Sequence, residues 1–436
     1  MDVASTPPAI GFVHAREPRL VFGHISDHAA IHALLRAANQ SPSYEDFLTS
    51  LDEPSYEPSD RLLLRYGQQI VAHAQLLERM AWFGGVKVAV GGVQDLAVLP
   101  EYAQAGYEVK LLATAEQQMH ESQAVISLVR SDRPQPFRAA GWTDVRAPGH
   151  SEVSVSDLLA HLSAQSAIAS RRWQSPQIRR WRHVELDAVR AVYAESASRG
   201  WGALHRGETY WQWLVGRKAH SDLIVAVEGA DQWQDTETES RIVGYAVACG
   251  GKILELCCLR DFARAAPRLV VRACQDAIER DHHTLSLYAP ASDPLHELIV
   301  TAGGSWCADE RSAGGTLLVK LLSPSRWVEA IYSILRRRAK RAGLPRPFQI
   351  CFECGSKRLQ LVVTRRSSRL VEDTSNAADV QCDAATFESL LVGNLNVAKA
   401  IELGRLHAAN EEMLKRVNAL FPPALFWQSQ FDVLRL

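Results

Sequence analysis

The sequence predicts an α+β protein with two successive units of similar element order and a third, smaller α/β domain. Its 436 residues are two to three times the usual size of one domain, about 100–200 residues. A run of strands precedes a helix and a further strand, which is typical of α+β domains, and this order returns in the middle of the chain. The expected division is an N-terminal domain over 1–147, a connector over 148–177, a second domain over 178–323 and a third over 324–436.

The first unit is predicted from hydrophobic periodicity and turn residues. Ile31, Leu34 and Leu35 recur at the spacing of one helical face, with Asp27 before them as a cap. Alternating apolar segments then predict a meander whose first two strands are joined by a short glycine-containing turn. The expected elements are strands at 20–23, 61–66, 70–80, 86–98 and 124–129 with a last one from 141, and helices from 27 and from 106.

The two later units follow from the same signals. The second is expected to repeat the strand, strand, helix, strand order, and the third begins with a helix that contains Trp327. In the second unit we expect strands at 223–227, 242–249, 252–259 and 284–289, a helix at 264–280 and a closing strand at 317–322. In the third we expect strands at 348–354, 358–363 and 380–382, and helices at 384–391 and from 410.

Charge and cysteine usage exclude several functional classes. Lys and Arg number 48 against 49 Asp and Glu, so the basic surface of a nucleic-acid-binding protein is not expected. No window approaches the ~20 apolar residues of a membrane helix, and no secretory leader is present. The 8 irregularly spaced cysteines suit reduced thiols. Cys351 and Cys354 have CxxC spacing, but they lie in a predicted strand, where residues three apart face opposite sides, and no second pair offers metal ligands. We expect a cytoplasmic protein that binds no nucleic acid, membrane or metal.

Residues 92–112 carry the most informative pattern. A strand ends at Val98 before Pro100, and after a short loop Gly106 opens a helix. This turn gathers backbone amides and the positive end of the helix dipole around one point, a geometry that binds phosphate. The alternative is an ordinary strand-turn-helix that binds no ligand.

The same stretch resembles the acetyl-CoA motif of the Gcn5-related N-acetyltransferase (GNAT) superfamily, whose loop reads [Arg/Gln]-x-x-Gly-x-[Gly/Ala] after a strand. The resemblance implies that acetyl-CoA is the co-substrate. It also implies that the strand backbone pairs with pantetheine and that the loop amides hold the pyrophosphate. The implied cofactor-binding residues are Leu96, Ala97, Val98, Ala105, Gly106 and Tyr107.

The chain departs from this pattern at three positions. Ala103 stands where the superfamily has Arg or Gln, which removes a charged hydrogen bond worth about 1.5–3 kcal/mol. Glu108 occupies the second small-residue position and would repel phosphate if it pointed inward. Phe137 stands in Phe-Arg-Ala-Ala-Gly-Trp where the superfamily tyrosine protonates the departing thiolate, and a phenyl ring has no proton to give. Ser131 and Asp132 are alternative polar groups there, each of which could equally cap a loop.

The third domain resembles a sterol-carrier-protein-2-like (SCP2-like) module through residues 378–406. Two tandem acetyltransferase-like units followed by this module resemble the enhanced-intracellular-survival (Eis-like) family, which acetylates amines. That resemblance implies a homo-oligomer, and a terminal carboxylate that acts as base in the first domain's cleft. By position this group belongs to Leu436.

The function implied by the resemblance is acetyl transfer to the primary amine of a small molecule, with Leu436 and Ser131 as candidate catalytic residues. A non-catalytic descendant that keeps the scaffold for ligand binding or assembly is the alternative, favoured by Ala103, Glu108 and Phe137. Lipid carriage by the third domain would require an apolar tunnel.

Overall fold

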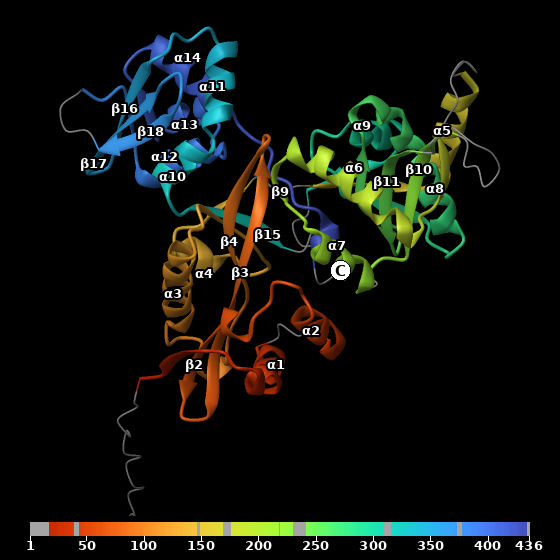
Figure 1. The fold of residues 1–436 in the computed structure, drawn as a ribbon, viewed down its shortest axis with the longest axis horizontal. Coiled ribbons are helices and arrows are strands. Elements are labelled where there is room, and N and C mark those ends of the chain that lie inside the picture. The colour runs from red at the N-terminus through yellow and green to blue at the C-terminus, as the bar shows by residue number, and fades with distance from the viewer. Residues whose placement is uncertain are drawn as a thin grey trace, which may run out of the picture.

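The computed structural model describes residues 17–38, 43–145, 149–168, 176–217, 219–229, 241–308, 315–372 and 377–433. Within these residues the strands form three mixed sheets, each associated with its own helices (Figure 1). The predicted α+β class is confirmed. The first sheet has the order β1 (Arg19–Phe22), β2 (Arg61–Tyr66), β3 (Gln69–Phe83), β4 (Val86–Val98), β5 (Ile126–Ser131), β15 (Thr316–Leu321) and β6 (Thr143–Asp144), and β9 (Trp201–Leu204) pairs with β3.

Helices cover both faces of the first sheet. Successive residues of a strand point to opposite faces, so Leu62 and Leu64 pack in the core beneath α3 (Tyr107–Glu121), whereas Leu63 packs with α1 (His28–Ala37). Figure 1 shows α3 on one side of the sheet and α1 with α2 (Tyr44–Leu51) on the other. The two cores fix the sheet between these helices.

The second sheet repeats the topology of the first. Three antiparallel strands, β10 to β12, are followed by a helix and by β13, which runs parallel to β12, as β5 runs parallel to β4. The order of the sheet is β14 (Ser305–Cys307), β7 (His150–Ser154), β13 (Thr284–Leu287), β12 (Lys252–Cys258), β11 (Arg241–Cys249), β10 (Asp222–Glu228) and β8 (Gln177–Arg180), with helices α5 (Val155–Ile168), α6 (Leu186–Ser198), α7 (Glu208–Gly216), α8 (Ala266–Ile278) and α9 (Pro294–Thr301).

Three strands cross between the predicted domains. β15 was expected to close the second unit, but it pairs with β5 of the first sheet, from Thr316 opposite Ser131 to Leu321 opposite Ile126. β7 lies in the predicted connector and joins the second sheet, while β9 extends the first. A strand's side-chain pattern fixes which face is buried and not which neighbour it pairs with, so the sequence could not reveal these exchanges.

The third sheet packs against the far end of the first. Phe83 on β3 meets Trp201 and Trp327 edge to face, with ring centroids 5.4 and 5.0 Å away. One apolar core therefore runs from the first sheet into this domain. None of the described helices combines the length and apolar character needed to cross a membrane. The elements of this domain are β16 (Phe348–Cys354), β17 (Lys357–Val363), β18 (Ser368–Glu372), β19 (Val380–Cys382), β20 (Leu406–Ala408), α10 (Pro324–Ala330), α11 (Tyr332–Arg341), α12 (Ala384–Val392), α13 (Val397–Glu402) and α14 (Glu411–Leu420).

Candidate active site

The parallel strands β4 and β5 pair over a short stretch and then diverge. Their register pairs are Val90 with Ile126 and Gly91 with Ser127, and none follows among the described residues. Beyond this point a cavity of about 870 Å³ lies between them, lined by residues 92–96 of β4 and 128–131 of β5. The strands thus form a wedge that exposes the edge of β4. The cavity is also lined by α2, by α7 of the second unit and by the C-terminal segment.

A buried histidine holds the bend at which β4 leaves its neighbour. Asp95 has φ of 54°, and the register of β3 with β4 shifts between His73 and Gln75. Arg61 Nη1 lies 3.1 Å from His73 Nε2, and His73 Nδ1 lies 2.8 Å from the Asp95 carbonyl oxygen. A guanidinium only donates, so Nε2 accepts and Nδ1–H donates to Asp95. Burial, reinforced by Arg61, lowers the pKa of His73 to about 3 and keeps this imidazole neutral.

Gly106 forms the predicted turn at the start of α3. Its φ of 72° is left-handed, and a Cβ there would meet no atom within 4 Å, so backbone conformation alone requires glycine. The Ala105 amide donates to the Tyr102 carbonyl at 2.9 Å and so belongs to the loop. The first amides of a helix lack partners within it, which leaves those of Gly106 and Tyr107 as the better phosphate donors.

Arg133 bridges the mouth of the wedge. Its Nη2 donates to the Leu96 carbonyl at 2.8 Å, and its Nη1 lies 3.6 Å from Oε1 of Glu108 in the first turn of α3. Glu108 therefore does not present an uncompensated negative charge to the turn. Leu96 lines the cavity, and its carbonyl, which the predicted pairing with a pantetheine arm requires, accepts from the Arg133 guanidinium.

The residues at the expected proton-donor positions lie in the cleft wall. Phe137 is buried against Trp142, with the two rings edge to face and centroids 5.8 Å apart. Ser131 lines the cavity, but its hydroxyl donates to the Arg133 carbonyl and accepts from the Arg133 amide, both at 3.1 Å. It closes a turn in the loop. Asp132 also lines the cavity.

The C-terminal segment returns from the third domain to this cleft. Gln428, Ser429, Asp432 and Val433 line the cavity, and Figure 1 shows the C-terminal chain running back toward α7. Leu436, the predicted base, lies outside the described residues, so its position is not part of the structure.

A buried ion network fixes this segment to the second domain. Arg206 donates to Asp432 through Nε and Nη2, both at 2.9 Å, and to both oxygens of Glu255 at 2.9 and 2.6 Å. Arg217 donates to the Phe431 carbonyl. Burial raises the pKa of Asp432 while Arg206 opposes that rise. Burial also acts to lower the pKa of Arg206, but its two carboxylate partners outweigh burial and raise it well above its usual value.

Known proteins resemble this chain in sequence and in fold. A family model for the acetyltransferase (GNAT) domain matches residues 24–144, and one for the sterol carrier protein domain matches residues 348–428. Solved structures of similar fold span nearly the whole chain. A GCN5-related N-acetyltransferase from Kribbella flavida superposes with a TM-score of 0.70 at 16% identity, covering 95% of this chain and 98% of its own.

Two further solved structures agree with this assignment. Another GCN5-related N-acetyltransferase, from Anabaena variabilis, gives a TM-score of 0.69 at 14% identity and covers 94% and 99% of the two chains. Eis1 from Mycobacterium abscessus gives 0.64 at 14% identity with the same coverage. No curated protein matches the chain. The predicted resemblance to the GNAT and Eis-like families is confirmed.

Several residues of the site were missed by sequence reasoning. Arg133 and His73 have no motif around them, and Arg206 is 226 positions away from Asp432 in the chain. The lone signal was the polar loop after β5, where Ser131 and Asp132 were considered and their neighbour Arg133 was not.

Proposed function

We propose that this protein transfers an acetyl group from acetyl-CoA to the primary amine of a small molecule in the wedge between β4 and β5. The observation that carries the proposal is the parting of these strands after Gly91 and Ser127, with a cavity of about 870 Å³ beyond it. An extended acyl-pantetheine arm can pair with the exposed edge of β4 as an added strand would. Its pyrophosphate would then meet the amides at Gly106 and Tyr107.

Arg133 supplies the positive charge that Ala103 does not. In the present conformation its guanidinium lies between the Leu96 carbonyl and Glu108. An arriving pantetheine amide would take the Leu96 carbonyl, which releases one side of the guanidinium beside the N-terminus of α3. Arg133 could then bind the pyrophosphate, because a charged hydrogen bond to phosphate outweighs a half-exposed ion pair at 3.6 Å.

The reaction needs a base for the amine and a proton for the sulfur. The amine must lose its proton before its lone pair attacks the thioester carbonyl, and the tetrahedral intermediate then expels the CoA thiolate. We assign the first role to the terminal carboxylate of Leu436. Val433 lines the cavity, and three residues can span up to about 10 Å, which is compatible with this role. Ser131 or a water molecule would protonate the thiolate, and Ser131 could do so only if its turn opened.

Binding and turnover of acetyl-CoA test the proposal. Calorimetric titration of the full chain should give one site, and CoA release should depend on an added primary amine. Arg133→Ala should weaken acetyl-CoA binding about ten- to a hundred-fold, the loss of about 1.5–3 kcal/mol. Arg138→Ala is the matched control, because that arginine pairs with Asp144 on the surface close by and should bind as the unmodified chain does. Tighter binding by Arg133→Ala would mean that Arg133 only obstructs the wedge.

Placing an extra residue after Leu436 tests the base. An added glycine moves the carboxylate by about 3.5 Å and should lower the rate of acetyl transfer about 10²–10⁴-fold, as loss of a positioned base does. Acetyl-CoA affinity should stay unchanged, because the wedge is untouched. Equal rates in the extended and unmodified chains would remove Leu436 from the mechanism.

A non-catalytic scaffold is the second candidate. Phe137 in the cleft wall and the closed turn at Ser131 favour it, since neither offers a free proton. A ligand that binds only the folded state raises the melting temperature. No thermal shift and no CoA release at millimolar acetyl-CoA would leave the scaffold function.

A further inference from the structure

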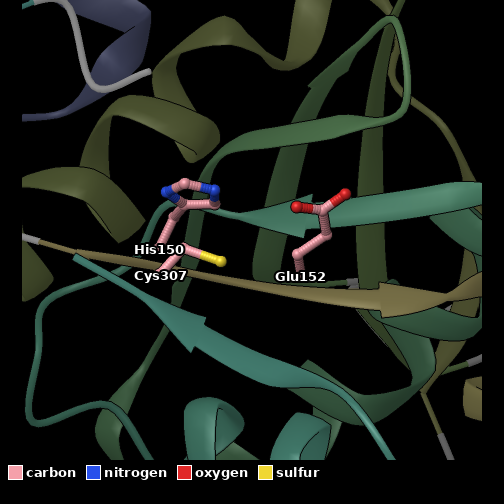
Figure 2. A group of neighbouring side chains, drawn as sticks. All are labelled: His150, Glu152 and Cys307. Atoms are coloured by element: carbon pink, nitrogen blue, oxygen red, sulfur yellow. The ribbon is translucent and has the colours of Figure 1, made fainter. Parts of the chain in front are cut away.

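We propose that His150, Glu152 and Cys307 form a zinc site at the edge of the second sheet. Their ligand atoms, one from each side chain, all lie within 4.8 Å of one another. Figure 2 shows the three side chains on one side of two neighbouring strands, with the imidazole and the thiol beside each other and the carboxylate facing them. None of the three lines the acetyl-transfer cleft.

Strand pairing produces this cluster. His150 and Glu152 are two residues apart on β7, so their side chains leave the same face. Cys307 on β14 is the direct partner of His150 in the antiparallel register, and cross-strand partners have Cβ atoms about 4.5–5.5 Å apart. The backbone therefore fixes the directions of all three side chains before any ion binds.

The surroundings hold the imidazole in place and leave the site accessible. The ring of His150 is 5% exposed and stacks on Tyr288, with centroids 4.9 Å apart and planes 18° from parallel. Glu152 and Cys307 are half-buried. The cluster thus has a fixed inner ligand and two outer ligands that an ion from solvent can reach, as a metal site with an entry path requires.

The donor set selects the metal. An imidazole nitrogen, a thiolate and a carboxylate oxygen are the ligands of zinc and related borderline-soft ions, whereas magnesium and calcium take oxygen alone. Around a tetrahedral zinc, with bonds of about 2.0–2.3 Å, the ligand atoms would lie roughly 3.3–3.7 Å apart. Small side-chain rotations achieve this from the present separations. The Cys307 thiol releases its proton to solvent as the metal–sulfur bond forms, and water completes the fourth position.

Such a site would link two strands that each adjoin a connection between the first sheet and the second. His150 begins β7, the strand that follows β6 of the first sheet, and Cys307 ends β14, the strand before β15 of the first sheet. A metal bound to both strands would therefore hold together the strand with which the chain first enters the second sheet and the strand with which it last leaves it.

Metal content of the untagged, full-length chain tests the site. After chelation and dialysis, the protein should take up one zinc per chain, measured by inductively coupled plasma mass spectrometry. His150→Gln, Glu152→Gln and Cys307→Ser should each weaken zinc affinity by more than the about 10–100-fold caused by loss of an outer-shell contact. Cys249→Ser, which changes a half-buried cysteine of the same sheet, should bind as the unmodified protein does. Equal zinc uptake in all variants would overturn the assignment.

A second measurement needs no variant and so avoids misfolding. Cobalt in the site should give the thiolate-to-metal charge-transfer absorption and the intense visible bands of tetrahedral coordination. Zinc should slow alkylation of Cys307 by iodoacetamide at least ten-fold, followed by peptide mass spectrometry, and should leave Cys249 unprotected. Cobalt binding without thiolate absorption, or equal alkylation of Cys307 with and without zinc, would contradict the proposal.

Discussion

His73 is the residue whose chemistry sets the shape of the cleft. Its neutral imidazole links Arg61 to the bulged strand at Asp95, and its pKa is about 3 in the folded protein because the ring is buried beside a cation. The unfolded chain binds a proton at this ring below about pH 6.5, whereas the folded chain does not. Stability from His73 is therefore complete above about pH 6.5 and is lost as the pH falls toward 3, by about 1.4 kcal/mol per unit.

The variant His73→Gln tests this linkage. Glutamine can accept from Arg61 and donate to Asp95, but it does not titrate. We expect the difference in unfolding free energy between the two proteins to shrink by about 2 kcal/mol from pH 7 to pH 5, measured by urea unfolding. In the control variant His120→Gln, at the exposed end of α3, the difference in unfolding free energy from the unmodified protein should be the same at pH 7 and pH 5. A constant difference between the His73 variant and the unmodified protein would mean that the pKa of the ring is the same in the folded and unfolded chains.

Single residues also mark where sequence reasoning works. Gly106 was predicted because a left-handed turn at a helix start has a compositional signal, and the structure has that turn. Glu108 was expected to repel phosphate if it pointed inward, and instead it pairs with Arg133. No local pattern could predict this pair, because it joins the first turn of α3 to the loop after β5, and their approach depends on how β4 and β5 part.

At the scale of elements, regular periodicity predicts strands and leaves their partners open. Strands β2 and β4 have the predicted bounds, 61–66 and 86–98, and the apolar face of α3 is buried as expected. The exchanges of β7 and β15 were missed because each strand is buried on pairing with either sheet. The metal cluster was missed for the same reason, since His150 and Cys307 meet only through the register of β7 with β14.

The C-terminal segment connects all three parts of the molecule through its contacts. It leaves the third domain, pairs Phe426 with Trp201 of the first sheet, and places Asp432 in the buried network of the second domain. All three parts of the chain thus contribute to one cleft. Arg206 and Glu255 are both fully buried, and Glu255 and Asp432 each contribute one carboxylate to the Arg206 guanidinium. The path of the C-terminal segment as far as Val433 therefore depends on contacts outside the wedge between β4 and β5.

Asp432→Asn tests whether the buried network positions the C-terminal segment for the proposed acetyl transfer. Asparagine keeps the size of the side chain but weakens the charged hydrogen bonds to Arg206, and we expect a loss of about 1–3 kcal/mol of stability, since Glu255 still neutralises the arginine. The released segment should become sensitive to carboxypeptidase, and acetyl transfer should fall at least ten-fold with acetyl-CoA affinity unchanged. Glu412→Gln breaks an exposed pair with Arg416 and should cost at most about 0.5 kcal/mol. If Asp432→Asn lost acetyl-CoA binding together with turnover, the network would support the wedge itself rather than the approach of the terminal carboxylate.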